Sequence, residues 1–140
     1  MGVEIREMVL ADYEAVVALW RSTPGVDIRP VTDSQDGIER LLARNPGLSV
    51  VAFDDGNLAG CALASHDGRR GFLQHVVVAP ALRGQGLARA MIDRCLEGLR
   101  EHQLGWVHLD VVVDNEAGMA FWQKAGWQPV DTLTRLSRAL

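Results

Sequence analysis

The stretch VVVAPALRGQGLARA, residues 76–90, constrains the fold of this chain more than any other. A run of β-branched residues ends at Pro80, a polar turn with two glycines follows, and an amphipathic pattern then begins. Together they predict a strand, a tight turn and a helix. The turn, residues 83–88, would place successive backbone N–H groups at a helix N-terminus, where they have no partners inside the helix. Because the helix dipole makes that end partly positive, the turn is typical of an anion site, above all for a pyrophosphate.

The spacing of small residues in the turn narrows the class of ligand. A P-loop needs a Lys-Ser/Thr pair, but the only lysine of the chain is Lys124. A dinucleotide fingerprint needs a third small residue where this chain has Arg89. What remains is the pattern Q/R-x-x-G-x-G/A, filled by Arg83, Gly86 and Ala88. The alternative is an ordinary glycine-rich turn between a strand and a helix.

A second patterned block covers residues 106–127, WVHLDVVVDNEAGMAFWQKAGW. Apolar residues alternate over 107–113, which predicts a strand. Asn115 interrupts the alternation and can cap a helix over 116–125, and Gly126 can end that helix. The block therefore predicts a second strand and helix after the first.

Together the two blocks resemble the small, single-domain bacterial members of the GNAT N-acetyltransferase superfamily. The first matches the acyl-CoA pyrophosphate loop of that family. The second matches a strand with L-x-V, an Asn four residues later, a helix ending in aromatic-x-K-x-G, and a further aromatic. The matching residues are Leu109, Val111, Asn115, Trp122, Lys124, Gly126 and Trp127. Two motifs in the family's order and at its separation make the resemblance specific.

The composition fits one domain over residues 1–140. A hydrophobic content of 48% and a charged content of 23% are ordinary for a globular chain. The net charge of −4 argues against nucleic-acid binding as a main role and is compatible with a cationic acceptor. Cys61 and Cys95 sit in apolar settings and are expected to be buried free thiols of a reducing compartment. The polar N-terminus and the lack of an apolar run of about 20 residues predict a cytoplasmic protein with no membrane partner.

Hydrophobic periodicity and turn residues predict alternating strands and helices along the whole chain. The expected strands are Val3–Met8, Leu48–Phe53, Leu58–Ser65, Phe72–Val78, 107–113, Trp127–Val130 and Leu133–Leu136. The expected helices are Asp12–Arg21, Asp33–Arg44 (capped by Thr32 or Asp33), Gly86–His102 and 116–125. The resemblance implies an α/β (α+β) GNAT fold. Its mixed, mostly antiparallel sheet would have about six to seven strands, splayed between 72–78 and 107–113 and flanked by four helices.

The resemblance also implies acetyl-CoA as the cofactor. Pantetheine would lie in the split of the sheet and bond the backbone of Val76 and Val78, with the thioester near Val76 and Val77. The residues expected to bind the cofactor are Val76, Val77, Val78, Arg83, Gly84, Gln85, Gly86, Leu87, Ala88, Asn115 and Trp122. The valines are equally consistent with a plain core strand, and no metal site is expected.

Acyl transfer to an amine needs a general base, because the ammonium must first lose a proton. Asp110 is the first candidate, since it takes the place of the glutamate in the L-E-V stretch of ribosomal-protein N-terminal acetyltransferases. His75 is the second, because it lies on the central strand beside the expected thioester and imidazole titrates near neutral pH. The competing readings are a solvated strand carboxylate and a histidine packed on the sheet surface.

Trp122 departs from the family pattern. Many GNAT enzymes have a tyrosine there that protonates the leaving thiolate, whereas an indole N–H donates a hydrogen bond but is not an acid at neutral pH. Solvent or another side chain would then supply the proton, or transfer would be slow. Trp122 could still contact pantetheine, or simply pack with Phe121 and Trp127.

The expected reaction is acetyl-CoA-dependent N-acetylation of an amine, carried by a small molecule or a peptide. Residues 22–31 would border the acceptor, and Asp27, Asp33 and Asp110 favour a cationic amine. A homodimer is expected from exposed edge strands. An acyl-CoA-binding regulatory protein with weak or lost catalysis is the main alternative, and an interaction domain whose turn binds nothing is the third.

Overall fold

The computed structural model describes residues 2–140. The chain divides into two compact units, Met1–Asp110 and Val111–Leu140. The first contains a β-sheet covered by helices, and the second contains one helix followed by an extended tail. A single domain over residues 1–140 stays a prediction.

The sheet of the first unit has the mixed topology that the sequence predicts. Within residues 2–140 it has five strands in the order β1-β2-β3-β4-β5, antiparallel except for the parallel pair β4–β5. The strands are β1 (Val3–Glu7), β2 (Val50–Asp54), β3 (Asn57–His66), β4 (Arg70–Val78) and β5 (Trp106–His108). Two hairpins join β2 to β3 and β3 to β4, as the turn residues predict. In the first, Asp55 and Gly56 both have positive φ, +50° and +82°.

The strand count is lower than expected. The closing strands at Trp127–Val130 and Leu133–Leu136 do not form, and residues 127–140 contain no regular element. Leu133 and Leu136 are 74% and 91% exposed. A two-stranded hairpin is marginal unless it buries an apolar face, so this short segment has nothing to stabilise it as strands.

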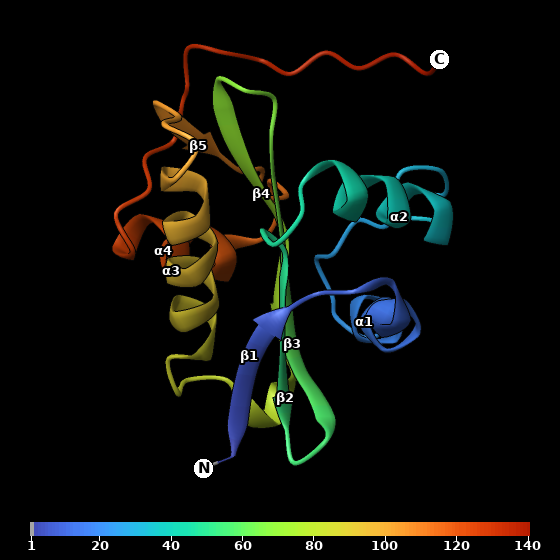
Figure 1. The fold of residues 1–140 in the computed structure, drawn as a ribbon. Coiled ribbons are helices and arrows are strands. Elements are labelled where there is room, and N and C mark those ends of the chain that lie inside the picture. The colour runs from blue at the N-terminus through green and yellow to red at the C-terminus, as the bar shows by residue number, and fades with distance from the viewer. Residues whose placement is uncertain (1) are drawn as a thin grey trace. The chain divides into compact units, whose positions relative to one another are not determined.

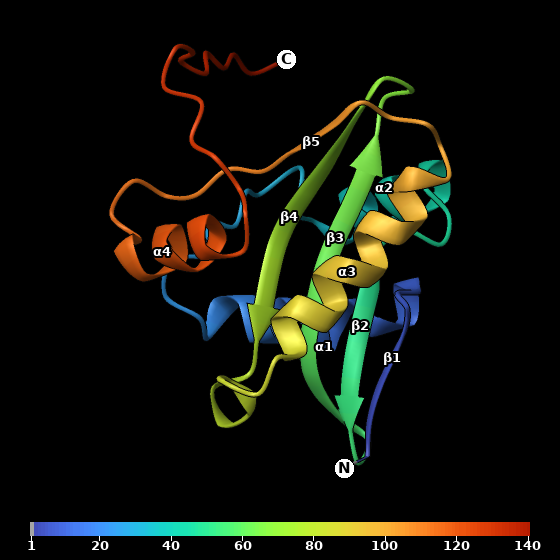
Figure 2. The same cartoon turned by 90° about the vertical axis from the view of Figure 1, so that its left-hand side faces the viewer.

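Helices cover both faces of the sheet. A short 3-10 turn, η1 (Leu10–Asp12), leads into α1 (Tyr13–Arg21), which lies with α2 (Gln35–Arg44) on one face, while α3 (Leu87–Arg100) crosses the other (Figures 1 and 2). The buried cluster on the α1 side comprises Met8, Val16, Val17, Trp20, Ile38, Val51, Cys61, Leu63 and Val77. On the α3 side the buried residues of the helix are Leu87, Met91, Ile92, Cys95 and Leu99, whose spacing is that of one helical face. Both cysteines are free, and burial raises the pKa of each thiol to about 12.

A bulge interrupts β4 at His75. Cys61 pairs with Val77 and Leu63 pairs with Gln74, so two residues of β4 lie opposite one residue of β3. His75 has a φ of +47°, in the left-handed region that costs a non-glycine residue about 1 kcal/mol. The bulge therefore places a strained histidine within β4.

The sheet splits next to β4, as expected. β5 pairs with β4 only at Arg70↔Trp106, Gly71↔Val107 and Phe72↔His108. The strand expected over 107–113 thus ends at His108, because the chain no longer follows β4 beyond that residue. Residues 73–78 of β4 have no partner in β5, and Asp110 lies two residues past the end of β5 rather than within a strand.

The second unit contains α4 (Glu116–Lys124), built as the sequence predicts. Asn115 is the N-cap, and its side chain accepts a hydrogen bond from the Gly118 N–H at 2.9 Å. Gly126 follows the helix with a φ of +100°. The Trp122 ring meets Phe121 and Trp127 edge-on, each at 5.3 Å between centroids.

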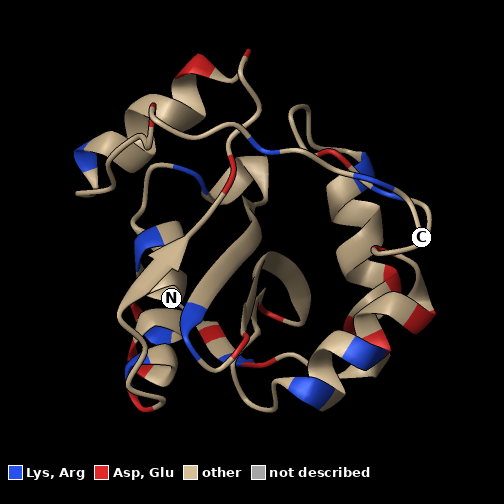
Figure 3. Ribbon diagram, turned by 90° about the horizontal axis from the view of Figure 1, so that it is seen from above, with Lys and Arg blue, Asp and Glu red and all other residues tan. Residues whose placement is uncertain are grey.

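Charged residues are mixed along the chain. Each of the helices α1 to α4 carries both acidic and basic side chains, and the ribbon in Figure 3 shows the two signs interspersed. No helix in the described part of the chain is long and apolar enough to cross a membrane.

Candidate functional site

The glycine turn lies between a short 3-10 helix, η2 (Pro80–Leu82), and the start of α3. Gly84 and Gly86 have φ values of +77° and +83°, so a side chain at either position would strain the backbone, although the space around both is open. Gly86 is the N-cap of α3 and supplies no side-chain hydrogen bond. The N–H groups of the first helical turn, beginning at Leu87, are therefore left to an acceptor from outside the helix.

Arg83 ties the turn back to β4. Its Nε donates a hydrogen bond to the Val78 carbonyl at 3.0 Å. The end of the strand and the beginning of the turn are thus held together, which fixes where the donors of the turn point.

The open edge of β4 presents the backbone groups that the sequence analysis assigned to pantetheine. The Ala79 N–H donates to the Ala59 carbonyl of β3 at 2.8 Å, so Ala79 faces β3. Because backbone groups alternate along a strand, those of Val76 and Val78 face away from β3, on the side that β5 leaves uncovered. The Val78 carbonyl already accepts from Arg83. The cofactor roles expected for the Val76 and Val78 backbone and for the glycine turn stay predictions.

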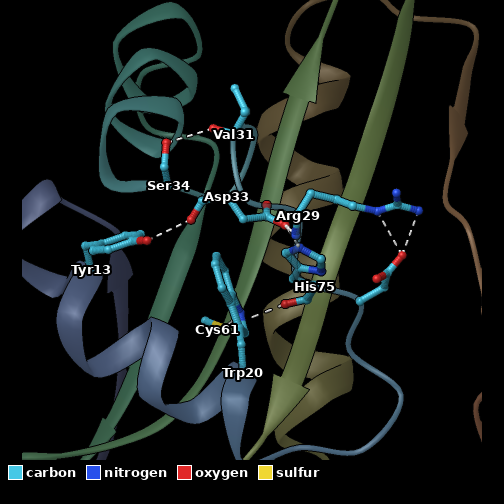
Figure 4. A network of polar contacts seen from close by, with 9 residues as sticks. Tyr13, Trp20, Arg29, Val31, Asp33, Ser34, Cys61 and His75 are labelled. Carbon is cyan, nitrogen blue, oxygen red and sulfur yellow. Dashed lines mark hydrogen bonds and ion pairs between the residues drawn. The ribbon is translucent and has the colours of Figure 1, made fainter. Parts of the chain in front are cut away.

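His75 is paired with a buried carboxylate. Its Nε2 lies 3.1 Å from Oδ2 of Asp33, and the two side chains are 18% and 10% exposed (Figure 4). A carboxylate oxygen can only accept, so Nε2 is the ring nitrogen that carries the hydrogen. The His75 ring also contacts the Trp20 ring, at 4.7 Å between centroids.

Asp33 is held by further hydrogen bonds through both its side chain and its main chain. Its Oδ2 accepts from the Arg29 backbone N–H at 2.8 Å, and its carbonyl accepts from the Tyr13 hydroxyl at 2.7 Å. Burial acts to raise the pKa of the Asp33 carboxyl, but the hydrogen bonds from His75 and from the Arg29 N–H outweigh it and lower the pKa below its usual value. Asp33 is therefore an anion at neutral pH.

The partner of His75 corrects one expectation about α2. Thr32 or Asp33 was expected to cap that helix, but the cap is Ser34, whose Oγ accepts from the Gly37 N–H at 3.1 Å. The Asp33 carboxylate does not cap the helix and instead contacts His75 of β4. No local pattern indicates this pairing, because Asp33 and His75 are 42 residues apart in sequence.

Trp20 and Cys61 secure the backbone under the histidine. The Trp20 indole N–H donates to the Cys61 sulfur at 3.3 Å, and that sulfur lies 3.6 Å from the His75 carbonyl oxygen. Trp20 is 1% exposed and Cys61 is fully buried. The bulge is thus fixed from the α1 side by two side chains that cannot move without opening the core.

The remaining candidates lie elsewhere in the chain. Asp110 is exposed and follows β5, whereas the bonds of His75 and Asp33 join α1, β4 and the segment before α2. Asn115 and Trp122 belong to the second unit, where Asn115 caps α4 and Trp122 packs against its aromatic neighbours. The cofactor roles assigned to these residues stay predictions.

The split mixed sheet with a glycine turn at a helix N-terminus defines the class of acyl-CoA-dependent transferases. Residues 13–127 match the Acetyltransferase (GNAT) family, and the chain belongs to that family. It is 35% identical over 131 residues to "Acetyltransferase ECA0875" of Pectobacterium atrosepticum, covering 94% of this chain and 92% of that protein. Acetyl-CoA is the cosubstrate of the family.

Solved structures show the same fold. A predicted acetyltransferase from Clostridium acetobutylicum, crystallised with acetyl-CoA, superposes with a TM-score of 0.80 at 20% identity, covering 96% of each chain. The PaiA N-acetyltransferase of Thermoplasma acidophilum, crystallised with coenzyme A, superposes with a TM-score of 0.81 at 18% identity, covering 94% of this chain and 92% of that one. At these identities the likeness concerns the fold.

Proposed function

We propose that this acetyltransferase moves the acetyl group of acetyl-CoA to the nitrogen of an amine, on a small molecule or a peptide, with His75 as the general base. The observation that carries the proposal is the His75–Asp33 pair at the bulge of β4. The strand that holds the base is the same strand that leads into the glycine turn, so one element orients both the proton acceptor and the anion site.

The chain supplies the steps that amine acetylation needs. Acetyl-CoA provides an activated acyl group when bound. His75 takes one proton from the ammonium, and the amine nitrogen forms a bond to the acyl carbon. The carbon–sulfur bond breaks with its electron pair on the thiolate, and the second proton on the nitrogen passes through solvent to that thiolate, which gives the acetamide and the CoA thiol. A backbone N–H on the open edge of β4, near Val76, is suited to stabilise negative charge on the acyl oxygen.

Asp110 is the alternative base. It is an exposed carboxylate beyond the end of β5, whereas His75 is mostly buried and oriented by a carboxylate of its own. An imidazole whose orientation is fixed by a carboxylate is suited to proton transfer, so we assign the role to His75 and treat Asp110 as the residue to compare.

The proposal is tested by measuring release of the CoA thiol from acetyl-CoA, with and without a panel of amines, amino acids and short peptides. Release that depends on one class of amine, with an acetamide as product by mass spectrometry, supports N-acetylation and identifies the acceptor class. A set of alcohols is run in parallel, and release that depends on an alcohol instead of an amine would count against N-acetylation. Binding of acetyl-CoA, measured by calorimetry, without release of the thiol for any acceptor would count against acetyl transfer.

The second candidate function is an acyl-CoA-binding regulatory protein. Trp122 favours it, because an indole cannot protonate the leaving thiolate as the family's tyrosine does. The same experiment separates the two functions, since a regulatory protein binds acetyl-CoA and changes a property of the chain, such as its melting temperature, without turnover.

A cytoplasmic site of action and a homodimer complete the proposal. Two buried free thiols suit a reducing compartment. The edge of β1 is partly used, because Arg94 of α3 donates to the Ile5 carbonyl at 2.7 Å, so a dimer through that strand would have to displace this bond. Sedimentation velocity of the full chain measures the oligomeric state directly.

A further inference from the structure

We propose that Asp33 is a positioning residue that fixes His75 in the Nε2–H tautomer and so makes Nδ1 the nitrogen that accepts the proton. The tautomer depends only on the geometry of the first unit. The role of Nδ1 in catalysis rests on the proposed function, and the two parts are tested separately.

Asp33 is itself fixed in place by its partners. Oδ2 faces two donors at once, the His75 Nε2–H at 3.1 Å and the Arg29 backbone N–H at 2.8 Å. The Tyr13 hydroxyl holds the carbonyl of the same residue from α1. Since both its main chain and its side chain are bonded, Asp33 presents one oxygen in one direction.

The histidine cannot adapt to a different partner by moving. Its ring contacts the buried Trp20, and its backbone is confined by the β4 bulge and the Cys61 sulfur. Its φ of +47° is a conformation that a non-glycine residue keeps only where its surroundings enforce it. With the ring held and an obligate acceptor at Nε2, the lone pair of the neutral imidazole is confined to Nδ1.

The negative charge of Asp33 also favours the imidazolium that forms when Nδ1 of His75 accepts a proton. In the step, an N–H bond of the acceptor ammonium breaks and an Nδ1–H bond forms, which leaves an imidazolium. The Asp33 carboxylate is mostly shielded from water, so its attraction to that cation is screened less than it would be at the surface. The other charged groups of the segment, Asp27 and Arg29, form an exposed ion pair with each other at 2.8 Å. Tyr13 contributes a neutral hydroxyl.

The first test is nitrogen NMR of histidine-labelled full-length protein at about pH 8.5, where a free imidazole is neutral. Long-range proton–nitrogen correlations distinguish the two tautomers, and loss of one pattern in His75→Gln identifies the signals of His75. We expect the Nε2–H pattern in the wild type and a mixture or the Nδ1–H pattern in Asp33→Asn, whose amide can also donate. An Nδ1–H pattern in the wild type would overturn the proposal, whatever the activity.

The second test is steady-state kinetics with an amine that the wild type acetylates. Asp33→Asn should lower kcat by about 10- to 100-fold and leave the KM for acetyl-CoA unchanged, because the base is misoriented but the cofactor site is intact. Asp36→Asn is the matched control: the same change three residues on, at an exposed position of α2. It should keep the wild-type kcat.

A conservative variant separates positioning from folding. Asp33→Glu keeps the charge and moves the carboxylate by one methylene, so we expect partial recovery of kcat and a larger share of the Nε2–H tautomer than in Asp33→Asn. If Asp33→Asn does not fold, by circular dichroism, Asp33→Glu is compared with Asp36→Glu instead. Equal kcat and an unchanged tautomer in the Asp33 and Asp36 variants would reject the positioning role. Wild-type protein with the Nε2–H tautomer and no turnover would reject only the proposed function.

Discussion

The polar network around His75, on β4, and the glycine turn between β4 and α3 differ in how their hydrogen-bond donors are used. In the network the Tyr13 hydroxyl, the Arg29 N–H and the His75 Nε2 each have an acceptor on Asp33. Among the described residues no buried side-chain nitrogen or oxygen lacks a hydrogen-bond partner. In the turn the N-cap has no side chain and the first helical N–H groups have no internal partner. A network whose donors are paired fixes the geometry that proton transfer needs, whereas the unpaired donors of the turn remain available to a ligand from outside the chain.

The network and the turn also differ in which residues adopt a left-handed backbone conformation. Both contain residues in the left-handed region, but the turn uses Gly84 and Gly86, which adopt it without strain. β4 uses His75 there and keeps a side chain at a cost. The difference indicates that the turn is needed for its main chain and the bulge for its imidazole.

Removing the imidazole should have the largest effect. His75→Gln is expected to lower kcat with the best amine by about 100- to 1,000-fold and to leave the Kd for acetyl-CoA within about twofold, because a glutamine cannot accept the proton. The measurement is steady-state kinetics combined with calorimetry. His102→Gln, at an exposed histidine two residues beyond the end of α3, is the control and should behave as wild type.

Asp110→Asn sharpens the same comparison. If His75 is the base, the Asp110 variant should lose less than about fivefold in kcat, which is a small part of what general-base catalysis contributes. A larger loss for Asp110→Asn than for His75→Gln would transfer the base to the end of β5.

Changing the turn should give the opposite pattern, and a smaller loss. Gly86→Ala is expected to weaken acetyl-CoA binding by about 10- to 100-fold, or about 1.4 to 2.7 kcal/mol, with kcat at saturation nearly unchanged. Gly56→Ala is its matched control: φ is +82° instead of +83°, the space is equally open, and the site is the β2–β3 hairpin. Both should lose similar stability, and equal acetyl-CoA affinity in the two variants would refute the role of the turn.

The turn could be predicted from the sequence and the network could not. The turn is local: two glycines, a preceding strand and a following helix lie within residues 76–90, so their chemistry can be read together. The network joins Tyr13, Asp33 and His75, which only the packing of α1 and of the segment before α2 onto the sheet brings together. The sequence indicated His75 as a possible base but gave no sign of its partner, and it expected Asp33 at a helix cap.

The strand ends show the same limit. Alternation over 107–113 predicts a strand, yet β5 stops at His108, because the split of the sheet removes its partner. The pattern of apolar residues fixes which side chains can face a core, and it does not fix where pairing stops. Asp110 was expected within this strand and lies two residues beyond its end.

Acid should destabilise the fold through two carboxyls, Asp33 of the network and Asp12, which is bonded to Arg6. Burial acts to raise the pKa values of Asp33 and Asp12, but hydrogen bonds outweigh burial and the pKa of each carboxyl is lowered. The donors to Asp33 are His75 and the Arg29 N–H, and the donors to Asp12 are Arg6 and the Val9 N–H. Because these carboxyls bind protons less readily when folded, the stabilisation is complete above the usual carboxyl pKa and is lost as the pH falls through the lowered values.

Chemical unfolding between pH 7 and pH 3 measures this dependence. Asp12→Asn removes a charged pair in which the Arg6 guanidinium donates at 2.8 and 2.9 Å, and should cost about 1 to 2 kcal/mol at neutral pH. The free energy of unfolding should also depend less steeply on pH in this variant, whereas Gly86→Ala should keep the wild-type slope. A wild-type slope in Asp12→Asn would show that other groups control acid unfolding.

The smallest effect is expected at Trp122, in the second unit. Trp122→Tyr introduces the phenol that many members of the family carry, at a position where the ring packs edge-on against Phe121 and Trp127. If protonation of the thiolate limits the rate, kcat should rise by about two- to fivefold and Trp122→Phe should not raise it, since only a phenol supplies an acidic hydrogen. Stopped-flow detection of the CoA thiol under single-turnover conditions isolates this step. An equal kcat in both variants would mean that solvent already protonates the thiolate fast enough, and that the proton transfer to His75, rather than the loss of the thiolate, limits kcat.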